Sequence, residues 1–311
     1  MLNRIKNEIC DMVKSRVLVD ESLKKHTTFG VGGLASLFIY PRSIDDLKRI
    51  LKYSFKNKIK IFFMGSGSNL LISDNGFDGI IVSLKKSFKH FELNDCLEAN
   101  IGTGVMLGHI VRTLTKKSVL GLESLIGVPG TLGGALIMNA GAYGHEISNY
   151  LVSIKVLSLE GEEKIYNKND LEFSYRFSSI PSNEIVVEAK FKFEVGDLNL
   201  INIQKSKASQ SRRNSQPLQF RSAGSIFKNP NSKQAAGYLI DQANLKGIRI
   251  GDAEISVKHA NFIINHGKAS SKDILELIKL IKTKVKQKFN IDLQLEVKLL
   301  GFHHSELEGI A

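Results

Sequence analysis

Two glycine-rich clusters are the densest concentration of residues that could bind a ligand. The first, after an apolar run at 59–64, comprises Gly65, Ser66, Gly67, Ser68, Asn69 and Leu70. The second comprises Pro129, Gly130, Thr131, Gly133 and Gly134 and continues through Asn139, Ala140 and Gly141. Glycine lets the backbone approach a ligand closely and turn N–H groups toward it, so both clusters suit a phosphate or diphosphate. Tight turns between strands are the alternative.

The two clusters do not follow the phosphate-binding motifs that have a fixed spacing. No Gly-Lys-Ser or Gly-Lys-Thr follows either cluster, so neither is a Walker loop. Leu70 stands where the dinucleotide fingerprint needs its third glycine, so a Rossmann domain lacks its main support. The sequence also has neither the H-E-x-x-H motif of metalloproteases nor the G-x-S-x-G motif of serine hydrolases. The clusters indicate a phosphate-bearing ligand without identifying it.

Three further groups of side chains are suited to proton or anion chemistry. They are Tyr175 and Arg176 at the end of an aromatic-rich run, Ser225 with Lys228 and Asn229 after a glycine, and Glu296 in an alternating segment. Each group taken alone also fits an ordinary structural role. An exposed arginine, a turn serine and a solvent-facing glutamate are common in any protein of this size.

Hydrophobic periodicity indicates a mixed α+β protein. We expect helices over 43–56, where Ser43 and Asp46 resemble a capping box, over 105–117, from Ser232 to Leu245, and from Ser270 or Ser271 to Phe289. Strands are expected over 59–64 and 79–84, at several places in 150–195, and over 293–299, where Glu296 lies on the polar face. The polar, basic stretch 197–216 is a helix or a linker that leads into a new unit.

Composition restricts the possible classes of protein. With 311 residues, of which 42% are hydrophobic and 24% charged, the chain can bury a sizeable core in about two domains. Two cysteines exclude a disulfide framework and suit a reducing compartment, so we expect a cytoplasmic protein. No apolar run approaches the length of a membrane span, and the N-terminal segment does not resemble a secretory signal. The net charge of +12 is compatible with nucleic acid, a membrane surface or small anionic ligands.

Eight stretches, in the same order along the chain, resemble the UDP-N-acetylenolpyruvoylglucosamine reductase (MurB) family of flavoenzymes. They are HTTFGVGG (26–33), GSGSNLLISDNGFDGIIV (65–82), GLESLIGVPGTLGGALIMNAGAYG (121–144), FSYR (173–176), QPLQFRSAGSIFKNP (216–230), AAGYLIDQANLKG (235–247), KHANFIIN (258–265) and LEVKLLG (295–301). The resemblance implies an FAD-binding fold of the vanillyl-alcohol-oxidase (PCMH) type and a C-terminal α+β substrate-binding domain. The expected parts are 1–56 and 57–196 for FAD and 197–311 for substrate.

The resemblance also implies a reaction and its residues. NADPH reduces FAD, which passes a hydride to C3 of the enolpyruvyl group of UDP-N-acetylglucosamine enolpyruvate, and protonation of C2 gives UDP-N-acetylmuramate. By motif, Ser225 is the proton donor, while Arg176 and Glu296 hold the substrate carboxylate. Since a glutamate helps here only as a hydrogen-bond donor, we expect the pKa of Glu296 to be raised. The cofactor would lie on the two glycine clusters.

Substrate contacts follow from the same resemblance, with some departures. Lys228, Asn229 and Tyr175 would contact the substrate, and Arg213 and Gln216 are candidates for its diphosphate. Arg176 and the strand expected near 184 are separated by a short segment, as in the subtype that lacks an inserted tyrosine loop. We expect a monomer that binds no nucleic acid. Another flavin oxidoreductase of the same fold and a basic nucleic-acid-binding protein are the alternatives.

Overall fold

The computed structural model describes residues 2–231 and 234–310. The chain divides into two compact units, each assembled from separate segments of sequence. Unit 1 comprises Met1–Asp20, Ser36–Ser66 and Gly79–Arg212, and unit 2 comprises Glu21–Ala35, Gly67–Asp78 and Arg213–Ala311. The first glycine cluster is therefore shared between the units, since the boundary falls between Ser66 and Gly67. The three consecutive ranges expected from the sequence stay a prediction.

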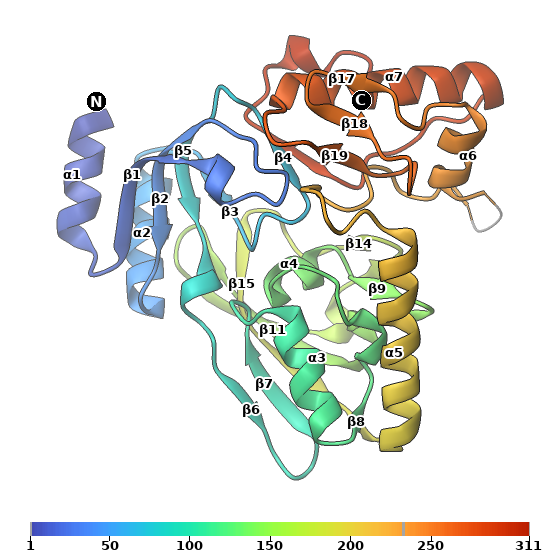
Figure 1. Cartoon of the computed structure of the whole chain (residues 1–311). Helices are drawn as coiled ribbons and strands as arrows, with labels where there is room; N and C mark the ends of the chain where they lie inside the picture. The colour runs from blue at the N-terminus through green and yellow to red at the C-terminus, as the bar shows by residue number, and fades with distance from the viewer. Residues whose placement is uncertain (1, 232–233, 311) are drawn as a thin grey trace. The chain divides into compact units, whose positions relative to one another are not determined.

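Unit 1 begins with two helices and a four-stranded sheet. Helices α1 (Leu2–Met12) and α2 (Ile44–Lys56) pack with the sheet β1-β2-β5-β3, in which β3 and β5 are parallel (Figure 1). The strands are β1 (Arg16–Ser22), β2 (Leu34–Tyr40), β3 (Ile61–Phe63) and β5 (Phe77–Val82). Leu47, Ile50 and Leu51 of α2 are fully buried, which is the apolar face expected from the sequence. The predicted cap is confirmed, because the Ser43 side chain accepts a hydrogen bond from the Asp46 N–H.

A five-stranded antiparallel sheet of order β12-β11-β15-β7-β6 forms the second part of unit 1. Its strands are β6 (Phe91–Leu93), β7 (Glu98–Gly102), β11 (Leu151–Ser158), β12 (Glu163–Asn167) and β15 (Glu184–Lys192). Helices α3 (Leu107–Lys116) and α4 (Leu132–Ile137) share its apolar core (Figure 1). Three short antiparallel pairs complete the unit: β8 (Val119–Leu120) with β16 (Glu194–Val195), β9 (Gly141–Ala142) with β10 (His145–Glu146), and β13 (Phe173–Ser174) with β14 (Phe177–Ser178).

Unit 2 is built around one long helix. Helix α7 (Ser271–Phe289) packs with α6 (Ala236–Gln242) and the antiparallel sheet of β17 (Arg249–Ile250), β18 (Ala253–Ile255) and β19 (Ile263–Asn265). The parallel pair of β4 (Leu70–Ile72) and β20 (Lys298–Leu300) joins two distant segments of the chain. The cap expected at Ser270 or Ser271 forms at Ser270, which exchanges side-chain and backbone hydrogen bonds with Asp273 as a capping box.

Two predicted elements differ from the structure and one ambiguity is resolved. The strand expected over 293–299 is reduced to β20, because 294–297 bonds to the segment around Phe227 and not to the sheet. The helix expected from Ser232 begins at Ala236, and Ser232 lies outside the described residues. The stretch 197–216 is helical as α5 (Leu198–Ser215), in which only Ile201 and Ala208 are buried. No helix among the described residues is long and apolar enough to cross a membrane. The α+β class is confirmed.

Candidate active site

The two glycine clusters meet in unit 1, at Gly65 and Thr131. The Met64 N–H donates to the carbonyl of Val82 at 2.9 Å, which holds the start of the first cluster beside the end of β5. A Cβ atom built on Gly65 would lie 2.6 Å from Oγ1 of Thr131, a residue that is itself buried. Only glycine, which has no side chain, lets the backbone at position 65 come this close to Thr131. The fold therefore brings together two clusters that are more than sixty residues apart in sequence.

Asn139 of the second cluster is buried and leaves a hydrogen-bond acceptor unused. Its Nδ2 donates to a carboxylate oxygen of Glu146 at 2.6 Å and to the carbonyl of Ser174 at 3.0 Å. These two acceptors fix the orientation of the amide, and its Oδ1 is buried without a partner among the described residues. An unpaired buried carbonyl is costly, so such an atom suits a donor supplied by a ligand. This atom and the glycine contact at Gly65 fit the cofactor-binding role expected for these loops.

Arg176 lies in a strained turn next to the second cluster. It is one of the two residues that connect β13 to β14, and its φ of 56° is in the left-handed region. Its guanidinium donates to the carbonyl of Gly141 at 3.2 Å and lies 5.0 Å from the ring centroid of Tyr175. Backbone strain of this kind costs about 1–3 kcal/mol and is concentrated at functional sites. The turn therefore holds an arginine beside residues expected to bind the cofactor.

Arg212 is a second arginine of this site, and the sequence reasoning missed it. Its Cδ would lie 3.3 Å from a Cβ built on Gly127, and its Nε is buried without a partner among the described residues. Burial lowers the pKa of Arg212, and the positive charge of Arg176 lowers it further while Tyr143 raises it. Two guanidinium groups that repel each other favour an anion between or beside them. The sequence offers two adjacent arginines with nothing to distinguish them, and the prediction named Arg213.

Ser225 and Glu296 are brought close together in unit 2. The Glu296 N–H donates to the carbonyl of Ile226 at 2.8 Å, and the N–H of Lys228 donates to the carbonyl of Gln294 at 2.9 Å. The serine loop therefore runs antiparallel to the segment that carries the glutamate, with a bridge between Phe227 and Leu295. Ser225 directly follows Gly224, whose φ is 78° and beside which a Cβ would meet no atom. The serine is thus held next to open space.

Asn261 fixes the serine loop, and the prediction of site residues did not include it. Its Oδ1 accepts from the Phe227 N–H at 3.0 Å and its Nδ2 donates to the Phe227 carbonyl at 2.8 Å. The backbone carbonyl of Asn261 also accepts from the Ile226 N–H at 2.9 Å. Asn261 is buried, so water does not replace these bonds at low cost. It is a positioning residue for Ser225.

Asn69 connects the first glycine cluster to Glu296. Its Nδ2 donates to the carbonyl of Glu296 at 3.0 Å, and its own carbonyl accepts from the Lys298 N–H at 3.1 Å. Leu70 begins β4 and is buried, and Gly67 accepts a hydrogen bond from the N–H of Thr28. The side chain of Asn69 therefore orients the segment that carries the glutamate. Its expected contact with the cofactor stays a prediction.

The expected substrate-binding residues have mixed surroundings. Lys228 follows the serine loop, and its positive charge adds to the desolvation that lowers the pKa of Lys298. The Asn229 side chain accepts from the Ala236 N–H at 3.0 Å, so it also fixes the start of α6. Arg213 is exposed, and Gln216 is half-buried. All four are in unit 2, with Ser225 and Glu296, whereas Tyr175 and Arg176 are in unit 1.

Comparisons with known proteins account for this arrangement. The family model "FAD binding domain" matches residues 35–165, and "UDP-N-acetylenolpyruvoylglucosamine reductase, C-terminal domain" matches residues 216–300. A UDP-N-acetylenolpyruvoylglucosamine reductase of Clostridium tetani is 41% identical over 298 residues, which are 96% of each chain. That of Clostridium novyi is 40% identical over 93% of this chain and 92% of its own.

A solved structure supports the same assignment. The crystal structure of UDP-N-acetylenolpyruvylglucosamine reductase (MurB) from Thermus caldophilus matches with a TM-score of 0.79 and 33% identity. The match covers 93% of this chain and 99% of that chain. The resemblance expected from the motifs is therefore confirmed, as is the FAD-binding domain. The chain belongs to the UDP-N-acetylenolpyruvoylglucosamine reductase family of FAD-binding oxidoreductases.

Proposed function

We propose that this protein reduces UDP-N-acetylglucosamine enolpyruvate to UDP-N-acetylmuramate, a precursor of peptidoglycan, with NADPH as the reductant. FAD bound to this chain would supply the hydride-transfer chemistry that links NADPH to C3 of the enolpyruvyl group. Gly65, Thr131 and Asn139 would hold the cofactor. The observation that carries the proposal is the hydrogen-bonded pairing of the Ser225 loop with the Glu296 segment, together with family membership.

Arg176 would stabilise the charge that develops on the substrate. Hydride addition at C3 moves negative charge onto C2 and its carboxylate, which a fixed guanidinium can bind in a bidentate manner. The turn of Arg176 holds the side chain against the Gly141 carbonyl, so little reorganisation is needed when the charge appears. Arg212 supplies a second positive charge to the same unit, and the diphosphate or the carboxylate of the substrate is its natural partner.

Ser225 would donate the proton to C2. A hydroxyl is a weak acid, but an enolate is a base strong enough to take its proton where water is excluded. Glu296 would hold the substrate carboxylate by donating a hydrogen bond, which requires its protonated form. Asn261 and Asn69 support these two residues through backbone hydrogen bonds of the serine loop and of the glutamate segment. Lys228, Asn229, Tyr175, Arg213 and Gln216 are proposed to contact the rest of the UDP-sugar.

The roles of Ser225 and Glu296 are tested by separating the two half-reactions in rapid mixing without oxygen. We expect Ser225→Ala to keep flavin reduction by NADPH close to wild type and to slow reoxidation by the enolpyruvyl substrate by about 10²- to 10⁴-fold. Glu296→Gln should likewise act mainly on the second half-reaction. Equal damage to both half-reactions in Ser225→Ala, or full turnover in Glu296→Gln, would contradict these roles.

The remaining proposals concern the state of the protein. We propose a cytoplasmic monomer of the subtype without the inserted tyrosine loop, and a protein that binds no nucleic acid. The short connection between Arg176 and β15 supports the subtype. Light scattering of the purified protein tests the monomer, and a dimer mass would refute it. Salt-sensitive binding to duplex DNA by a flavin-free protein would favour the nucleic-acid alternative.

A further inference from the structure

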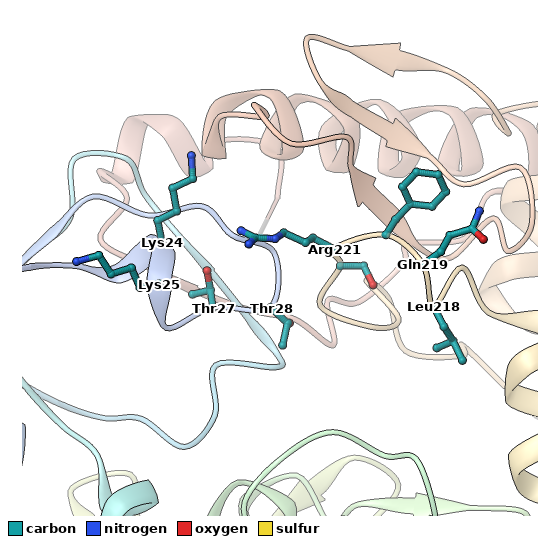
Figure 2. Close-up of a pocket in the computed structure, with 9 residues that line it drawn as sticks. Lys24, Lys25, Thr27, Thr28, Leu218, Gln219 and Arg221 are labelled. Atoms are coloured by element: carbon teal, nitrogen blue, oxygen red, sulfur yellow. The ribbon is translucent and has the colours of Figure 1, made fainter.

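A pocket of about 630 Å³ lies entirely within unit 2, and none of the residues given a role so far lines it. One side is the turn after β1, with Lys24, Lys25, Thr27 and Thr28, and the other is the loop 218–222. Figure 2 shows the Arg221 side chain reaching from this loop toward the turn that carries Lys24 and Thr27. A volume of this size is typical of sites for small organic ligands.

The lining of this pocket carries three positive charges and no carboxylate. Lys25 lies 3.7 Å from Glu21, a carboxylate that also contacts His26 at 2.9 Å. Neither Lys24 nor the Arg221 guanidinium has a hydrogen-bond or ion-pair partner in the part of the chain that the structure describes. These three exposed cations repel one another where they gather at the pocket, and an anionic ligand would relieve that repulsion.

Arg221 is anchored by its backbone, and its side chain packs against Gly30. Its backbone carbonyl accepts from the Asn265 N–H at 2.9 Å, which fixes the loop. Its side chain lies on the backbone of Gly30, so closely that a Cβ at position 30 would come within 2.8 Å of the arginine Cδ. Gly30 has a φ of 68°, a conformation that glycine adopts without strain. Packing on Gly30 restricts the arginine side chain, which reduces the entropy that it loses when it binds a ligand.

The available donors indicate the class of ligand. The Thr27 hydroxyl donates to the Val31 carbonyl at 2.7 Å, so it stabilises the turn and is not a donor for a ligand. The guanidinium of Arg221 and the ammonium of Lys24, the two cations of the lining without a partner among the described residues, match the oxygens of a phosphate in charge and in number of donors. We propose that this pocket binds a phosphate group, either free phosphate or the phosphomonoester of a nucleotide.

The proposal is tested by calorimetric titration of the purified protein with inorganic phosphate, at constant ionic strength in a buffer free of phosphate and sulfate. We expect saturable binding that Arg221→Met weakens by about tenfold or more, because it removes a charge-assisted pair. Lys24→Met, on the exposed side of the pocket, should weaken binding in the same direction and serves if Arg221→Met does not fold. Lys284→Met is the matched control, because it removes one exposed charge of α7 outside the pocket.

Titration with NADP⁺ and NAD⁺ identifies the source of the phosphate. If Arg221→Met weakens NADP⁺ binding and leaves NAD⁺ binding unchanged, the pocket takes the 2′-phosphate of the nucleotide. If Arg221→Met changes phosphate binding alone, the ligand is free phosphate. Absence of saturable phosphate binding, or an equal loss in Lys284→Met, would overturn the proposal. Because the experiment measures the heat of phosphate binding, its result does not depend on whether the protein reduces the enolpyruvyl substrate.

Discussion

Removing the Asn261 side chain tests whether the serine loop is positioned by the hydrogen bonds described above. Asn261→Ala leaves the N–H and the carbonyl of Phe227 without the partners they have at 3.0 and 2.8 Å. Each of these two buried groups left unpaired costs about 1–3 kcal/mol. Water that enters the cavity left by the side chain recovers part of this cost. We therefore expect the free energy of unfolding to fall by about 2–4 kcal/mol. Denaturant unfolding followed by circular dichroism measures this loss.

The same variant should also affect one half-reaction selectively. A loop that shifts by about 1 Å can lower the rate of a positioned step by about 10²-fold, so reoxidation by the enolpyruvyl substrate should slow by about 10- to 100-fold. Flavin reduction by NADPH should stay within about twofold of wild type, since Ser225 has no role in that step. Anaerobic rapid mixing separates the two rates.

Asn265→Ala is the matched control. Asn265 is also buried in unit 2, where it donates to the Phe29 carbonyl at 2.8 Å and accepts from the Gly267 N–H at 2.7 Å. Its Oδ1 also accepts from the Ala269 N–H at 3.1 Å, so Asn265→Ala should lose at least as much stability, without the selective effect on reoxidation. A cost below about 0.5 kcal/mol for Asn261→Ala, or equal slowing of reoxidation in both variants, would refute the positioning role.

Three further predictions concern Gly65, Arg212 and His259. Gly65→Ala should weaken FAD retention during gel filtration, because its Cβ would lie 2.6 Å from Thr131 Oγ1. Arg212→Met should raise the KM for the enolpyruvyl substrate by about tenfold, and the exposed Arg213→Met by less. Burial lowers the pKa of His259, with Lys246 adding to it, so the folded state favours the neutral ring. The free energy of unfolding should therefore fall as the pH drops below about 6.5, and His259→Gln should reduce that dependence in denaturation at pH 7.5 and 5.5.

Local signals in the sequence predicted the helices well. Ser43 was expected to cap α2, and Ser270 or Ser271 to cap α7; Ser43 and Ser270 form these caps. Each cap depends only on one side chain and the backbone N–H three residues further along the chain. The apolar faces of both helices are buried as the periodicity indicated. Such features depend on neighbours in sequence and can be found without knowing the rest of the fold.

Long-range pairings explain what the sequence did not predict. The alternation over 293–299 is real, but this segment bonds first to the serine loop and then to β4, so the strand is short. The role of Asn261 depends on a backbone segment more than thirty residues away. The sequence does not distinguish Arg212 from its neighbour Arg213. Only the packing shows that Arg212 is half-buried, with its Nε buried, whereas Arg213 is exposed. The motifs indicated the family and the catalytic candidates, but not the residues that support them.

An anaerobic absorbance trace of the FAD-loaded protein tests the proposed function most directly. NADPH is added first, in the amount needed to reduce the flavin, and UDP-N-acetylglucosamine enolpyruvate follows. We expect the flavin band to bleach with NADPH and to return with the enolpyruvyl substrate in the absence of oxygen. A band that bleaches and returns only with oxygen would identify a different flavin oxidoreductase, and a protein that cannot be loaded with FAD would contradict the proposed function.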